Sequence, residues 1–393
     1  MTSSRSSRPR LISLDVLRGA VMILMALDHA RDFMGDIRLS PENLATTSGA
    51  LFFTRWVTHF CAPVFVLLAG LSAFLYGSAA ERTRAQLSRF LFTRGAWLLL
   101  LEFTLVNNAW RLEIPQTVWI FQVIAVLGVG MMLLAPLVGL PARWVGILGA
   151  ACIAGHALLP PNGAANPADT SLWLTILNGG FRAWRFDNGN GLLTIYAVLP
   201  WFGVIALGYG LGPLFRAEAR LRRRSLLAMG LGFSALFVLL RATNSYGDPI
   251  PFAAQDRSAG DLIAFLNTNK YPASLQYLLM TLGPSLVALA LLEGARGAVA
   301  NVLATFGRVP LLYYVAHVYL LHGAARLTYG LMYGDYASPT QLGSSPQGFP
   351  TWFGFGLPVV YLSWITTVML LYLPCRAFAR LKQRKRSWWL SYL

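Results

Sequence analysis

The fold of this 393-residue chain is decided by its first apolar stretch, which reads RLISLDVLRGAVMILMALDHARD at residues 10–32. The stretch is long enough to cross a membrane as a helix, although it carries several charged side chains. Alternating steps of three and four residues place one set of positions on a single helical face, namely Asp15, Arg18, Met22, Met25, His29 and Asp32. Because charged groups are costly inside a membrane, this polar stripe is predicted to face the protein interior or a wet cavity.

The composition of the whole chain is that of a membrane protein. Apolar residues make up 56% and charged residues only 12%, about half the usual fraction in soluble proteins. A cytosolic enzyme of this size would need more charge to cover its surface. The net charge of +16 comes from short basic blocks between apolar runs, which argues against nucleic-acid binding. The three cysteines, Cys61, Cys152 and Cys375, have neither metal-binding nor disulfide-framework spacing.

Runs of roughly 20 apolar residues predict about ten transmembrane helices. The predicted spans are 11–34, 56–77, 90–110, 117–139, 144–160, 191–215, 225–241, 273–293, 303–325 and 354–376. The first run lacks a cleavage site for a signal peptide, so it is predicted to remain as a helix. Since no internal repeat or low-complexity linker separates the spans, we expect an all-α, polytopic helix bundle that forms one domain over residues 1–393.

The distribution of basic residues predicts the orientation. With the N-terminus inside, the cytoplasmic segments hold 20 of the 32 lysines and arginines, and the four long loops (35–55, 161–190, 242–272 and 326–353) all lie outside. Both termini are therefore predicted to be cytoplasmic. The basic blocks at 216–224 and 376–386 are expected to contact anionic membrane lipid.

Ionisable residues inside the spans are the candidate functional groups. His29 is a candidate general base, with Asp28 or Asp32 to orient its ring. Arg18 lies three turns before His29, about 16 Å along the helix, where it could bind a phosphate. The alternative is structural: Asp15–Arg18 and His29 with a carboxylate would be ion pairs that lock the bundle together.

Other spans supply further candidates. All five histidines are predicted in the outer half of the membrane, and His59 and His317 are the second choices for a base. His156 and His322 are expected to be packing residues. A metal site is disfavoured, because His317 and His322 are five residues apart and do not share a helical face.

Several polar residues of the spans carry weaker predictions. Arg94 and Arg308 could bind phosphates or serve as orienting charges. Asn107 and Tyr313 could stabilise an oxyanion. Glu102 is expected to pair with an arginine of a neighbouring helix.

The predicted outer loops combine aromatic residues with Asn, Asp and Gln, as in WRFDNGN at 184–190 and NTNKYP at 267–272. Such a mixture suits a sugar site, and it equally suits an aromatic belt with ordinary turns. Lys270 is notable because the chain has only three lysines, and the other two, Lys382 and Lys385, are predicted to be cytoplasmic.

Several segments resemble the transmembrane acyltransferases similar to heparan-alpha-glucosaminide N-acetyltransferase, in particular a bacterial branch of unknown function. The resemblance is most specific in residues 10–32 and continues in APVFVLLAG (62–70), LPWFGVIALGYG (199–210), GDP (247–249), KYPAS (270–274) and FGRVP (306–310). The pair Arg18 and His29 also resembles the Arg/Lys-x10-His motif of bacterial O-acyltransferases that modify surface polysaccharides. The lysosomal family member carries Asn at the position of His29 and its histidine about a dozen residues later, where residues 37–41 hold none.

The resemblance implies transfer of an acetyl group from acetyl-CoA to a sugar or glycan on the other side of a membrane. Arg18, Arg94 and Arg308 would then bind the donor, and direct transfer with His29 as base is favoured over an acetyl-histidine intermediate. We expect a multi-pass protein of a bacterial inner membrane, with lipid, acetyl-CoA and a glycan acceptor as partners, and the sequence leaves a homodimer open. The alternatives are a transporter or flippase without covalent chemistry, and a scaffold or receptor that binds a glycan.

Overall fold

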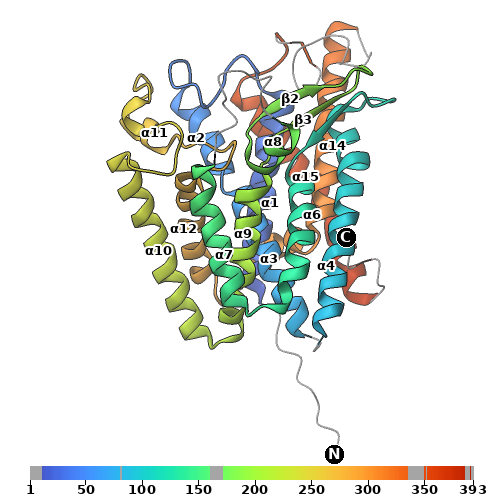
Figure 1. Cartoon of the computed structure of the whole chain (residues 1–393). Coiled ribbons are helices and arrows are strands. Elements are labelled where there is room, and N and C mark those ends of the chain that lie inside the picture. The colour runs from blue at the N-terminus through green and yellow to red at the C-terminus, as the bar shows by residue number, and fades with distance from the viewer. Residues whose placement is uncertain are drawn as a thin grey trace, which may run out of the picture.

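The computed structural model describes residues 11–79, 82–159, 171–334, 349–350, 352–385 and 390. Arg5, Arg8 and Arg10, which contributed to the predicted orientation, lie outside these ranges. The described chain is mostly helical, which confirms the helical class (Figure 1). The helices are α1 (Ile12–Met34), α2 (Gly49–Thr58), α3 (Cys61–Ala79), α4 (Arg84–Leu101), η1 (Glu102–Val106), α5 (Asn107–Arg111), α6 (Val123–Leu134), η2 (Ala135–Gly139), α7 (Ala142–Gly155), η3 (His156–Leu158), α8 (Leu172–Asn178), α9 (Val198–Gly210), η5 (Gly212–Arg216), α10 (Ala219–Thr243), η6 (Phe252–Ala254), α11 (Asp261–Leu266), α12 (Leu275–Leu291), α13 (Ala298–Arg308), α14 (Pro310–Tyr333) and α15 (Leu357–Arg384).

A small sheet corrects the strictly all-α prediction. Its strands are β1 (Val118–Phe121), β2 (Arg182–Arg185) and β3 (Gly191–Thr194), in the order β1-β3-β2. β3 pairs in parallel with β1 and antiparallel with β2. The predicted spans 117–139 and 191–215 therefore begin as strands, because their apolar first residues pair across the chain instead of starting a helix. Figure 1 shows the sheet with α2, α8 and α11 at one end of the bundle, here called the sheet end.

The membrane-spanning capacity of the helices agrees with part of the sequence prediction. Among the described residues, five helices are long and apolar enough to cross a membrane, and a sixth span results if α13 and α14 count as one. Three shorter helices are also apolar: Val123–Gly139, Ala142–Leu158 and Leu275–Leu291. α1 has 23 residues but carries too many charges to qualify by composition. Ten spans therefore remain a prediction.

The predicted span 303–325 is not one straight helix. α13 and α14 meet at an angle of 86°. Pro310 begins α14, where a proline is tolerated, and its ring and missing N–H prevent α13 from continuing through it. The bend places Arg308 and Tyr313 on two differently directed helices.

Glycines set the closest helix crossings. A Cβ added at Gly19 would lie 1.7 Å from the carbonyl oxygen of Leu303, and one at Gly307 would lie 1.9 Å from that of Asp15. The backbones of α1 and α13 therefore touch, as small residues allow inside membranes. Because Arg18 and Arg308 adjoin these glycines, the crossing brings their side chains to the same place.

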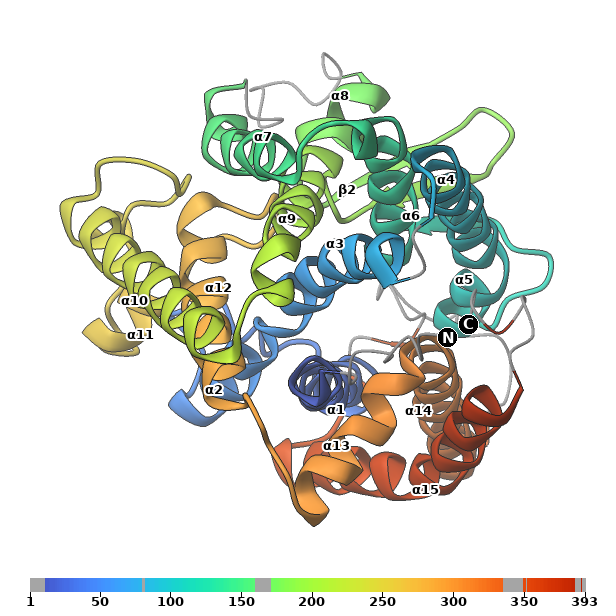
Figure 2. The same ribbon diagram turned by 90° about the horizontal axis from the view of Figure 1, so that it is seen from below.

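The helices differ in how much of their surface faces outward. α1 packs against α2, α3, α12, α13, α14 and α15, and Figure 2 shows it enclosed by other helices. α10 and α15 lie at the periphery, and α15 exposes Leu362, Met369 and Leu373. Exposed apolar side chains along a long helix are what a lipid-facing surface presents. The polar stripe of α1 thus lies inside the bundle, as its periodicity predicts.

Candidate active site

A cavity of about 360 Å³ joins the three arginines that the sequence predicts as phosphate ligands. Arg18, Arg94 and Arg308 line it together with Lys382, and its other walls are largely apolar, formed by Phe65, Phe90, Leu98, Ile124, Leu127, Met131, Leu311 and others. We call it the arginine cavity. Side chains from α1, α4, α13 and α15 converge here, although they are far apart in the sequence.

Asp15 organises two of these arginines. Its Oδ1 lies 3.6 Å from Arg18 Nη1, and its Oδ2 lies 3.5 Å from Arg308 Nε. Arg18 Nη2 also donates a hydrogen bond to Ser72 Oγ at 2.8 Å. The structural ion pair considered from the sequence is therefore present, and it holds the arginines at the cavity wall.

His29 forms a hydrogen-bonded pair with His317 of α14. His29 Nδ1 lies 2.6 Å from His317 Nε2, and the two rings are nearly parallel, at 4°. His317 Nδ1 lies 2.7 Å from the backbone carbonyl oxygen of Tyr313. A carbonyl only accepts, so neutral His317 carries its proton on Nδ1 and accepts at Nε2. His29 must then donate from Nδ1, which leaves a lone pair on its Nε2 as a base or nucleophile.

The carboxylates near His29 bind arginines, contrary to the predicted orienting role. Arg31 Nη2 donates to Asp28 at 3.1 Å and to Asp32 at 2.6 Å. Arg55 Nη1 donates to the other oxygen of Asp28 at 2.5 Å. Two guanidinium groups at helix ends can reach these carboxylates more directly than the adjacent imidazole can. His317, and neither Asp28 nor Asp32, therefore fixes the ring of His29.

The charged network continues through Glu42 to His59. Glu42 Oε1 accepts a hydrogen bond from Arg55 Nε at 3.0 Å and lies 3.3 Å from His59 Nε2. Burial alone would raise the pKa of Glu42, but Arg55 and His59 outweigh it and hold that pKa below its ordinary value. His59 thus belongs to the network around Asp28, whereas it does not contact His29 among the described interactions.

A second cavity, of about 590 Å³, adjoins this network at the sheet end. Charged groups of Arg31, Asp32 and Asp36 line it, with the aromatic rings of Phe181 and Phe355 and the segment around Ser40. We call it the sheet-end cavity. Arg31 and Arg18 are thirteen residues apart on α1, so the two cavities lie about 20 Å apart along its axis.

The structure assigns other roles to two polar candidates. Asn107 donates from Nδ2 to the carbonyl oxygens of Glu102 (2.6 Å) and Ile120 (3.0 Å), so its amide is engaged with the backbone. Glu102 accepts the backbone N–H of Ala125 at 2.9 Å, near the start of α6. The expected arginine partner of Glu102 is therefore wrong, because a helix N-terminus takes that place.

The remaining candidates are buried. Tyr313 is fully buried and stacks on His317, with ring centroids 5.1 Å apart. Lys270 is also buried, and its Nζ lies 5.1 Å from the ring centroid of Tyr271. His156 lies 3.2 Å from Asn178 Oδ1, and His322 Nδ1 bonds the carbonyl oxygen of Ala109 at 2.9 Å, as packing residues do.

Sequence reasoning missed Arg31, Arg55 and Glu42 as members of the site. Arg31 follows Asp28 by three residues on α1, which is a signal for an ion pair. Arg55 and Glu42 carry no comparable signal, since their partners are remote in sequence. In the described parts of the chain, no group of three or more His, Cys, Asp or Glu residues is placed to hold a metal ion.

Fold and site together define a membrane protein with a helical bundle, a buried histidine pair and one cavity toward each end of α1. The family profile described as heparan-alpha-glucosaminide N-acetyltransferase, catalytic, matches residues 10–243. The chain belongs to this family, and the resemblance noted from the sequence is confirmed. The family is one of membrane acetyltransferases. Lys270, Arg308 and His317 lie beyond the matched residues. No curated protein matches the chain.

Proposed function

We propose that this protein transfers an acetyl group from acetyl-CoA, bound at the arginine cavity, to a sugar hydroxyl or amine that enters from the sheet end. The observation that carries the proposal is the His29–His317 pair, with its hydrogen bonds of 2.6 and 2.7 Å. The second histidine fixes the tautomer of His29 and leaves its Nε2 unprotonated. A general base needs this arrangement, because one ring nitrogen must stay unprotonated.

The arginine cavity fits the donor by its chemistry and size. Guanidinium groups bind phosphate through paired, charge-assisted hydrogen bonds, and Arg18, Arg94 and Arg308 line this one cavity. Its volume of about 360 Å³ is within the roughly 300–1,000 Å³ typical of ligand sites. The apolar wall beyond the arginines would hold the uncharged arm of the donor. This arm must cover the distance of about 16 Å that separates Arg18 from His29 along α1.

The sheet-end cavity would admit the acceptor. Its carboxylates and guanidinium group could hydrogen-bond sugar hydroxyls, while Phe181 and Phe355 provide flat apolar surfaces for a sugar ring. Asp32 belongs both to this cavity and to the charged network that reaches Asp28, the neighbour of His29. An acceptor bound here would therefore lie at the end of α1 that carries the proposed base.

The transfer step follows from the state of His29. Its Nε2 takes the proton of the acceptor hydroxyl or amine as the acceptor attacks the acetyl carbonyl carbon. His317 keeps the Nδ1 proton in place while His29 carries the transferred proton on Nε2. His29 then returns the proton to the departing sulfur. The same Nε2 could instead accept the acetyl group, and direct transfer is the version we propose.

We further propose that ten helices cross a bacterial inner membrane with the sheet end outside. The support is the distribution of basic residues: of the 32 lysines and arginines, 20 fall on the predicted cytoplasmic side. Figure 1 shows the connection between α9 and α10 at the end opposite the sheet. This connection contains η5, which ends at Arg216.

Purified protein tests the proposal directly. With acetyl-CoA and a panel of amino sugars and neutral sugars, the wild-type chain should release free CoA thiol and form an acetylated sugar. His29→Ala should lower this rate by roughly 10²-fold or more, the usual contribution of a general base, and should still bind CoA. The matched control is His156→Ala, another buried histidine, which should keep most activity. Transport of a sugar without release of thiol would instead establish the transporter alternative.

A further inference from the structure

The strongest feature that the proposed reaction leaves unused is the side chain of Lys270. This lysine is only 6% exposed. Its Nζ lies 5.1 Å from the ring centroid of Tyr271 and 6.0 Å from that of Tyr196. Among the described residues, no hydrogen bond or ion pair involves this ammonium group. Burial of an ammonium group without a hydrogen-bonded partner is costly, and the two tyrosine rings offset only part of that cost.

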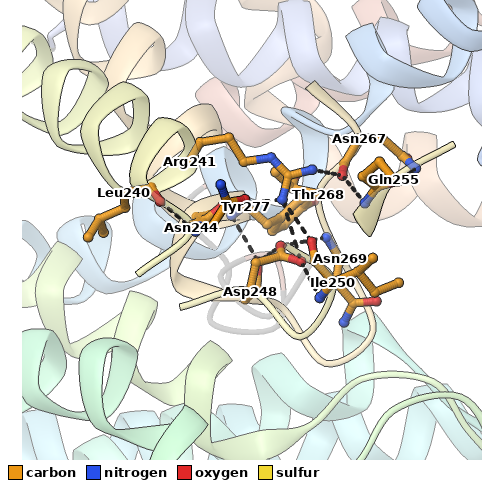
Figure 3. Close-up of polar contacts among 12 residues, drawn as sticks. Leu240, Arg241, Asn244, Asp248, Ile250, Gln255, Asn267, Thr268, Asn269 and Tyr277 are labelled. Atoms are coloured by element: carbon orange, nitrogen blue, oxygen red, sulfur yellow. Dashed lines mark hydrogen bonds and ion pairs between the residues drawn. The ribbon is translucent and has the colours of Figure 1, made fainter. Parts of the chain in front are cut away.

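The loop that carries Lys270 is fixed on both sides. Arg241 is fully buried and donates to the carbonyl oxygens of Ala264 (3.0 Å) and Phe265 (2.9 Å). It also donates to the carbonyl oxygen of Asn267 at 2.7 Å (Figure 3), three residues before Lys270.

Asp248 fixes the same loop immediately before and after the lysine. Its Oδ2 accepts the N–H of Asn269 at 2.9 Å (Figure 3) and the hydroxyl of Ser274 at 2.7 Å. The backbone on both sides of Lys270 is therefore held by buried polar contacts. A group placed so rigidly can act on a reacting atom without first being ordered.

The charges around His29 indicate what Lys270 can bind. Three carboxylates and three cations gather there, namely Asp28, Asp32, Glu42, Arg31, Arg55 and Lys270. Lys270 is close enough to act electrostatically on both Asp28 and His29. When the histidines are neutral, the three carboxylates and the three cations of this cluster give a net charge of zero. A permanently anionic ligand would upset this balance, whereas a neutral carbonyl that becomes negative only during reaction would not.

We propose that the ammonium of Lys270 binds the acyl carbonyl oxygen and stabilises the oxyanion formed in the transfer. The inference rests on the proposed acetyl transfer and adds a catalytic residue to it. Asn107, the other candidate with an N–H donor, is occupied by backbone carbonyls.

The step balances in atoms and charge. The acceptor oxygen or nitrogen bonds to the carbonyl carbon, its proton moves to His29 Nε2, and the carbonyl π electrons move to the oxygen held by Lys270. The new negative charge appears together with the positive charge on His29, so the net charge of the site stays constant. When the carbonyl re-forms, the carbon–sulfur bond breaks and the sulfur takes the proton from His29.

The test compares Lys270→Met, which keeps the length and apolar stem of the side chain, with Lys385→Met, an exposed lysine at the end of α15. Two rates are measured on each purified protein: acetyl transfer to a sugar, and slow hydrolysis of acetyl-CoA by water without any sugar. In both reactions the negative charge develops on the same oxygen, that of the acyl carbonyl. Lys270→Met should therefore lower both by about 10²–10³-fold, as loss of one oxyanion donor does, and donor affinity and thermal stability should stay near wild type. Lys385→Met should change neither rate.

Each other outcome overturns the inference in a distinguishable way. If Lys270→Met raises the KM for the sugar and leaves hydrolysis unchanged, Lys270 anchors the acceptor instead. If the thermal midpoint falls and both rates, counted per folded molecule, equal those of the wild type, the lysine is structural. If both rates equal those of the wild type, Lys270 has no part in the reaction. A wild-type chain that releases no CoA under any condition would overturn the proposed acetyl transfer itself, and this inference with it.

Discussion

Replacement of Gly19 by alanine should separate α1 from α13 and weaken donor binding at the same time. The added Cβ would lie 1.7 Å from the carbonyl oxygen of Leu303 and 2.5 Å from its carbonyl carbon. Both atoms belong to the backbone, so no side chain can rotate away. The contact must lengthen to at least 3.4 Å, the lower limit of ordinary van der Waals contact.

The magnitude follows from this geometry. Overpacking of a tight interior contact costs about 1–3 kcal/mol. The same separation would lengthen the link of 3.5 Å between Asp15 and Arg308, because these residues lie on the two helices that part. Loss of that link should cost about 1 kcal/mol more. Since Arg308 lines the arginine cavity, we expect CoA to bind about tenfold more weakly, which corresponds to about 1.4 kcal/mol.

The matched control is Gly323→Ala. Gly323 also lies within a helix, α14, but a Cβ at this position would meet nothing within 4 Å. Alanine is the better helix former by about 1 kcal/mol, so this variant should be as stable as wild type or more so. Thermal unfolding in detergent and calorimetry with CoA give both quantities. Equal stability and equal CoA affinity in the two variants would refute the claim that the glycine crossing positions the arginines.

The remaining predictions concern the donor, the histidine pair and the orientation. Arg18→Gln should weaken CoA binding about tenfold and Arg18→Lys less, measured by calorimetry, and an unchanged affinity would leave Arg18 a purely structural residue. His317→Phe, which removes the acceptor for the Nδ1 proton of His29, should lower kcat by at least tenfold and shift its pH profile while CoA affinity is kept; an unshifted profile would contradict the tautomer assignment. In a background without the native cysteines, Ser258→Cys should react with a membrane-impermeant thiol reagent on intact cells and Glu218→Cys only after lysis, and the reverse pattern would invert the proposed orientation.

The sequence predicts α1 and its interior face well because helical periodicity reports which side chains share a face. It also predicts that Arg18 and Arg308 are candidates for one ligand, although only the α1–α13 crossing makes them neighbours. Periodicity cannot say which groups of other helices meet that face. His29 was expected to bind an adjacent carboxylate, and it binds His317, 288 residues away in sequence.

The partners of buried polar groups were the least predictable part. Arg55 and Glu42 lie in segments without polar periodicity. Arg55 contacts both Asp28 and Glu42, and its contact with Asp28 depends on how α2 packs against α1. The strands were missed for a similar reason. The first residues of two apolar runs are equally compatible with a strand and with a helix, and only pairing with a distant segment determines which of the two forms.

The placement of Arg18 and His29 on one unbroken helix limits how this chain can change in evolution. Insertion of a single residue between them would turn one half of α1 by 100° against the other and lengthen it by only about 1.5 Å. His29 would then leave His317, even though the added length is trivial. Insertions that come closest to preserving the facing have three or four residues, roughly one turn of about 5.4 Å. In the proposed transfer, the distance that the acyl donor must cover could therefore change only in steps of about one helical turn. A donor with a slightly longer or shorter arm would have to be accommodated by residues elsewhere in the cavity.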